Sequence, residues 1–76
     1  MNLKETAEQY RENAAAYRKR INELKARLES ENNAMEALRL RGRIRTLESF
    51  YAESMNTAHY LDRYYAEQHR GEDNAI

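Results

Sequence analysis

The fold of this chain is decided at residues 29–33, Glu-Ser-Glu-Asn-Asn, which separate two apolar repeats that differ in phase. On each side of this stretch, apolar residues recur at alternating steps of four and three. The first repeat comprises Leu3, Ala7, Tyr10, Ala14, Tyr17, Ile21, Leu24 and Leu28, and the second comprises Ala37, Leu40, Ile44, Leu47, Tyr51, Ser54, Ala58, Leu61 and Tyr65. Such steps keep apolar side chains on one stripe of a helix, which then needs a partner helix. The break in phase therefore predicts two helices rather than one.

Capping signals predict where the two helices begin. Asn2 precedes Glu5 by three residues and Asn33 precedes Glu36 by three, which is the spacing of a capping box. Gly71, after a histidine and an arginine, is typical of the residue just past a helix end. We expect one domain over residues 1–71, with a helix over 3–29, a turn over 30–33 and a helix over 34–70, followed by a frayed tail over 72–76.

Composition limits the classes of protein that the chain can belong to. The 76 residues form one small domain at most, and the absence of cysteine excludes disulfides and thiolate metal sites. The net charge is zero, although 34% of the residues are charged. No apolar run approaches the roughly 20 residues that cross a bilayer, and the first residues lack the apolar core of a signal peptide. A cytoplasmic protein without membrane association is the expectation.

An all-α antiparallel hairpin built from these helices leaves its core unfinished, because each helix covers only one side of the other. If the turn is centred near residue 32, Leu3 reaches only as far as Leu61, and Tyr64 and Tyr65 overhang the first helix. The simplest closure is a homodimer that forms a four-helix bundle, while an unidentified protein partner is the alternative. The expected oligomer interface consists of Leu47, Phe50, Tyr51, Met55, Tyr60, Leu61, Tyr64 and Tyr65.

A basic band is the most distinctive local feature. Its members, which hairpin formation brings to one level, are Arg18, Lys19, Arg20, Arg39, Arg41, Arg43 and Arg45. Arginine binds phosphate in a fork, so nucleic-acid or other anion binding is one interpretation. The favoured interpretation is that these side chains flank the seam and that acidic residues of a second hairpin balance them. Gly42, inside the band, is expected to mark a close helix approach or a tolerated weakness, with a hinge as the alternative.

No catalytic, metal or cofactor motif is recognisable in the sequence. His59 and His69 are ten residues apart, without a second ligand at a useful spacing. No acidic pair predicted to face inward, glycine-rich phosphate loop or nucleophile motif is present. We expect no enzyme, no cofactor and no metal.

The second helix carries a family resemblance. Its Arg-rich segment from Leu38 to Leu47, followed by Tyr60-Leu61-Asp62-Arg63-Tyr64-Tyr65, resembles small uncharacterised helical-hairpin proteins of bacterial phage-like or conjugative mobile elements. The resemblance covers about half of the chain and implies a cytoplasmic accessory protein, with no active residues to transfer. The predicted function is a non-enzymatic helical interaction or scaffold protein that acts through self-association. The alternative is a nucleic-acid-binding or regulatory accessory factor that uses the basic band.

Overall fold

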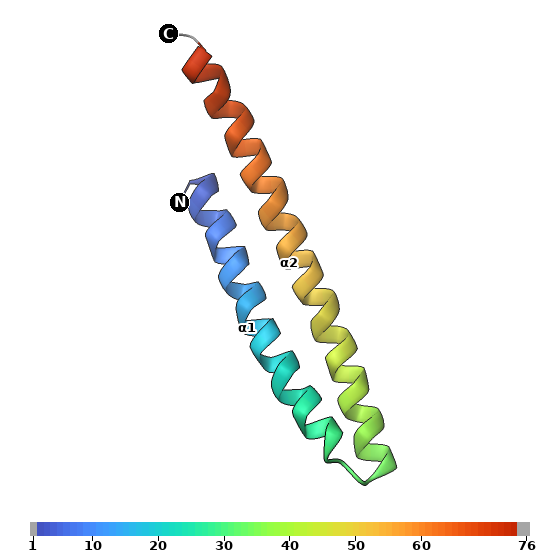
Figure 1. Ribbon diagram of the computed structural model, residues 1–76. Coiled ribbons are helices and arrows are strands. Elements are labelled where there is room, and N and C mark those ends of the chain that lie inside the picture. The colour runs from blue at the N-terminus through green and yellow to red at the C-terminus, as the bar shows by residue number, and fades with distance from the viewer. Residues whose placement is uncertain (1, 75–76) are drawn as a thin grey trace.

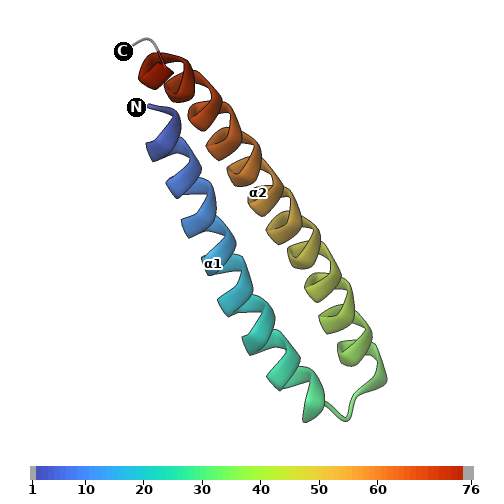
Figure 2. The same ribbon diagram turned by 45° about the horizontal axis from the view of Figure 1, so that its top comes forward.

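The computed structural model contains two helices, α1 (Leu3–Glu29) and α2 (Ala34–Asn74), which lie side by side and antiparallel (Figures 1 and 2). The structure describes the backbone of residues 2–74 and the side chains of residues 2–67. The prediction of an all-α helical hairpin is therefore confirmed, with α1 at its predicted bounds. Assembly into a four-helix bundle stays a prediction.

Both predicted N-caps form. The Asn2 side chain accepts a hydrogen bond from the Glu5 amide at 2.8 Å, and the Asn33 side chain accepts one from the Glu36 amide at 3.0 Å. Each bond satisfies one of the amides that a helix start leaves without an intrahelical acceptor. The capping role that the spacing predicted for Asn2 and Asn33 is therefore confirmed.

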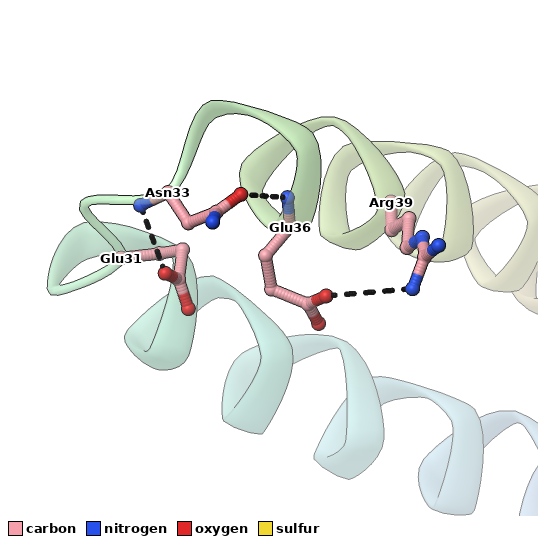
Figure 3. A network of polar contacts seen from close by, with 4 residues as sticks. All are labelled: Glu31, Asn33, Glu36 and Arg39. Atoms are coloured by element: carbon pink, nitrogen blue, oxygen red, sulfur yellow. Dashed lines mark hydrogen bonds and ion pairs between the residues drawn. The ribbon is translucent and has the colours of Figure 1, made fainter.

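The turn replaces the second half of the expected capping box with a different contact (Figure 3). The Asn33 amide donates to the carboxylate of Glu31 at 3.0 Å, so it does not need the carboxylate of Glu36. Glu36 instead lies 3.8 Å from Arg39 of the same helix. At the other side of the turn, the Ser30 amide donates to the carbonyl of Arg27 at 3.2 Å, which ends α1 with a tight turn.

α2 continues past its predicted end. The helix includes Gly71 and runs to Asn74, and no described glycine has a positive φ. Glycine permits the left-handed conformation that closes a helix but does not require it, and the chain has no proline that would stop the helix. Of the predicted frayed tail, residues 72–74 are therefore helical, while residues 75 and 76 lie outside the described residues.

The buried side chains of the core differ in size along the hairpin. Near the turn, Ile21 and Leu24 pack with Leu40 and Ile44, and this cluster is covered by Leu28, Leu47 and Tyr51. Toward the open end the buried seam residues are small, and they are Ala7, Ala14, Ser54 and Ala58. Larger apolar side chains bury more area, so most of the hydrophobic stabilisation comes from the half next to the turn.

The two helices differ in length, and the open end is staggered. α1 has 27 residues and α2 has 41, so α2 extends beyond the start of α1 (Figure 1). The Cα atoms span 65 × 17 × 13 Å. Tyr64 is exposed, as predicted, whereas Tyr65 is half-buried rather than exposed.

Gly42 is not a point of close helix contact within the hairpin. A Cβ atom added to it would meet no atom within 4 Å, and α2 is continuous through it. The prediction that Gly42 marks a close approach of the two helices is therefore wrong for the hairpin. The other prediction, that the glycine is a weak point of the helix that the fold tolerates, remains.

Candidate interaction surface

The seam between the helices has a solvent-facing edge on each side, and on one of these edges ion pairs connect α1 with α2. Arg11 donates to Asp62 at 2.6 Å, and the Lys25 ammonium lies 3.7 Å from the carboxylate of Glu48. Arg18, midway between Arg11 and Lys25 in the sequence, lies over the ring of Tyr51 with its guanidinium carbon 4.5 Å from the centroid. Because these three cations are seven residues apart, they share one side of α1. We call this side of the hairpin the paired edge.

The opposite edge presents aromatic side chains and has no ion pair between the helices among the described side chains. The Tyr17 ring of α1 contacts the Phe50 ring of α2, with centroids 5.7 Å apart. Further along α2, the rings of Tyr60 and Tyr64 stack with centroids 6.5 Å apart. Phe50 and Tyr64 are both 43% exposed, and Tyr60 is 67% exposed. We call this side the open edge, because apolar rings on it remain in contact with water.

A groove opens on this edge near the turn. Its lining consists of Arg20, Arg39, Gly42, Arg43, Thr46 and Leu47. Arg20 forms a 3.1 Å ion pair with Glu23 along α1, and Arg39 lies 3.8 Å from Glu36 (Figure 3). Arg43 has no carboxylate partner among the described side chains. Three arginine side chains therefore line the groove together with Leu47, an arrangement that favours an apolar group with a negative charge beside it.

The predicted interface residues do not form one surface. Phe50, Tyr60 and Tyr64 lie on the open edge, whereas Leu47 and Tyr51 pack against the core of the hairpin itself. The half-buried members of the set are Leu47, Tyr51, Met55, Leu61 and Tyr65. Met55 lies seven residues from both Glu48 and Asp62, which places it on the paired edge. The open-edge aromatic residues are therefore the part of the set best placed to meet a second molecule.

The basic band is likewise divided. The groove brings together Arg20, Arg39 and Arg43, while Arg18 lies on the paired edge over Tyr51. The remaining members, Lys19, Arg41 and Arg45, are exposed and do not line the groove. The structure thus contains a local site of three arginines in place of a continuous basic face.

The described residues contain no group of three or more histidine, cysteine, aspartate or glutamate side chains placed to hold a metal ion. His59 is exposed, and the side chain of His69 lies outside the described residues. Within the described part of the chain, neither helix combines the length and the apolar character of a bilayer span.

The distinction between the two edges was missed at the level of the sequence, although a signal for it exists. Lys4, Arg11, Arg18 and Lys25 are seven residues apart on α1, and Glu48 and Asp62 are fourteen apart on α2. Two charged lines of opposite sign at heptad spacing indicate which flanks of the helices meet. The sequence contains no comparable signal for the groove. The groove depends on the conformations of three arginine side chains that come from both helices.

No protein-family model, curated protein or solved structure matches this chain. The resemblance to proteins of mobile elements and the cytoplasmic location therefore stay predictions. The two edges and the groove are the features of the structure that bear on function.

Proposed function

We propose that this protein is a non-enzymatic helical interaction protein that acts through self-association, with the open edges of two hairpins packing together in a four-helix bundle. The observation that carries the proposal is the contrast between the edges. One edge is joined by ion pairs, while the other leaves Phe50, Tyr60 and Tyr64 exposed. Aromatic side chains bury a large area when a partner covers them, and they are enriched at protein interfaces.

The small core supports the same proposal. Among the described side chains, four large aliphatic ones are buried, and they are Ile21, Leu24, Leu40 and Ile44. Each contributes roughly 1.5–3 kcal/mol, which has to offset the entropy of ordering two long helices. Two-helix units of this size usually need a further source of stability, and oligomerisation is one such source. Covering Tyr60 and Tyr64 would add apolar burial toward the open end of the hairpin, where the buried seam residues are small.

A matched pair of substitutions tests the proposal. Tyr60 is 67% exposed on the open edge, and Leu38 is 60% exposed on a line of α2 whose other members, Arg45, Ala52 and His59, also face solvent. Replacing either side chain with glutamate adds the same charge, but only Tyr60→Glu places it in the proposed interface. We expect sedimentation equilibrium to give a dimer for the parent chain and for Leu38→Glu, and a monomer for Tyr60→Glu. A parent chain that is folded and monomeric at tens of micromolar would overturn the proposal.

Nucleic-acid binding by the basic band is the competing function, and a binding assay with variants of the groove arginines distinguishes it from self-association. Fluorescence anisotropy with a labelled 20-base-pair DNA duplex and a single-stranded RNA of equal length, at low salt, reports such binding directly. Self-association predicts no binding that depends on Arg39 or Arg43. Salt-sensitive binding that a double replacement of these arginines by alanine abolishes would instead favour the accessory-factor alternative.

A further inference from the structure

Charge is distributed unequally between the two halves of the hairpin. Residues 16–48, which include the turn and the groove, contain nine lysine and arginine residues against five aspartate and glutamate residues. The remaining residues contain four against eight. The contact between Tyr17 and Phe50 shows that the limits of this segment lie near the same level on both helices. The neutral chain is therefore a rod with an excess of four positive charges near the turn and four negative charges toward the open end.

We infer that the partner at the open edge is a second copy packed antiparallel, so that the C-terminal part of each α2 covers the arginine groove of the other copy. This inference rests on the proposed function and specifies its geometry. Antiparallel packing brings the positive half of each hairpin against the negative half of the other. The groove, which Leu47 lines together with Arg20, Arg39 and Arg43, then receives tyrosine rings and a carboxylate from the partner copy.

The spacing of side chains on α2 gives the register. Arg43, Phe50 and Tyr64 lie on one line of α2 at multiples of seven residues, and Thr46, Tyr60 and Glu67 lie on the adjacent line. When two copies of α2 run antiparallel about residue 55, Arg43 faces Glu67, Thr46 faces Tyr64 and Phe50 faces Tyr60 of the other copy. Because α2 extends from Ala34 to Asn74, this register overlaps the two helices along nearly their whole length.

Two other arrangements fit the charges less well. A parallel dimer would place the positive half of one copy beside that of the other. A dimer that overlaps only at the C-terminal ends of the two α2 helices, and so buries only Tyr60 and Tyr64, would bring Glu67 close to Glu67 of the other copy. Like charges held together at an interface oppose association, and neither arrangement brings Glu67 of the other copy to the groove.

Engineered cysteines test the register without interference, because the chain contains none. We expect an equimolar mixture of Thr46→Cys and Tyr64→Cys to form a mixed disulfide in glutathione buffer. Either variant alone should form little disulfide dimer, because antiparallel packing separates its two cysteines by about 27 Å along the bundle, beyond the Cα separation of a disulfide. A disulfide dimer of Thr46→Cys alone that matches the mixture in yield would show parallel packing and overturn the inference.

Charge reversal tests the proposed contact between Arg43 and Glu67. We expect Arg43→Glu and Glu67→Arg each to raise the dimer dissociation constant about tenfold, because the two-fold axis repeats the altered contact. The double variant should return to within about threefold of the parent. A double variant as weak as either single variant would overturn the contact, whereas a monomeric parent would overturn the proposed function itself.

Discussion

At the residue scale, Asn33 determines where the second helix starts. Its side chain accepts from the Glu36 amide, while its own amide is held by Glu31 (Figure 3). We expect Asn33→Ala to lower the free energy of unfolding by about 1 kcal/mol, measured by urea denaturation. Asn32→Ala, in the same turn but without a hydrogen bond to α2, is the matched control. Equal losses for both variants would contradict a capping role.

Gly42 is a weak position for helix formation in the interior of α2. An added Cβ would meet no atom of the hairpin within 4 Å, so alanine there should gain helix propensity without a clash. We expect Gly42→Ala to raise the free energy of unfolding by about 1 kcal/mol. Thermal denaturation followed by circular dichroism measures the change. A lower stability would show that a second copy approaches this residue closely, since the hairpin itself leaves the space open.

Single residues also show what could be predicted from the sequence. Asn2 and Asn33 were identifiable as caps because capping depends on a spacing of three residues within one segment. Gly71 was misjudged because a glycine can either end a helix or continue it, and local sequence does not decide between the two. The three arginines of the groove could not be separated from their neighbours, because their convergence depends on the packing of α1 against α2.

At the scale of the elements, α1 and α2 are held together mainly by the cluster next to the turn. Leu24 is fully buried in this cluster. We expect Leu24→Ala to lower the free energy of unfolding by about 2–5 kcal/mol, from lost burial and the cavity that remains. Leu38→Ala removes the same side chain from a position that is 60% exposed and should change stability by less than about 0.5 kcal/mol. Similar losses in urea denaturation would contradict the position of the core.

The pairing of the two elements was predictable because it follows from one periodicity. Leu24 and Leu40, which pack in the same cluster, belong to the two seams that the apolar repeats define. The edges were not predicted, because the apolar repeat is the same whichever flank of a helix meets its partner. The contacts of Arg11 with Asp62 and of Lys25 with Glu48 make that distinction, and each is an exposed pair worth less than about 1 kcal/mol. Ion pairs of this strength select which flanks of the helices meet, while the apolar cluster supplies most of the stability of the pairing.

At the scale of the whole molecule, the unequal distribution of charge predicts a specific response to salt. If antiparallel packing brings opposite halves together, added sodium chloride screens a favourable interaction, and the dimer should weaken between about 0.05 and 0.5 M salt. Apolar contacts alone would be insensitive to salt or strengthened by it. Sedimentation velocity across this range distinguishes the two cases. A dimer that tightens with salt would contradict the antiparallel arrangement.

Self-association through the open edge is the central claim, and the mass of the particle in solution tests it most directly. The chain has a mass of 9.1 kDa, so sedimentation equilibrium at tens of micromolar should give twice that value. Small-angle scattering of the same sample should give a longest dimension close to the 65 Å of a single hairpin, because the two copies overlap along their length. A folded particle of 9.1 kDa under these conditions would contradict the claim.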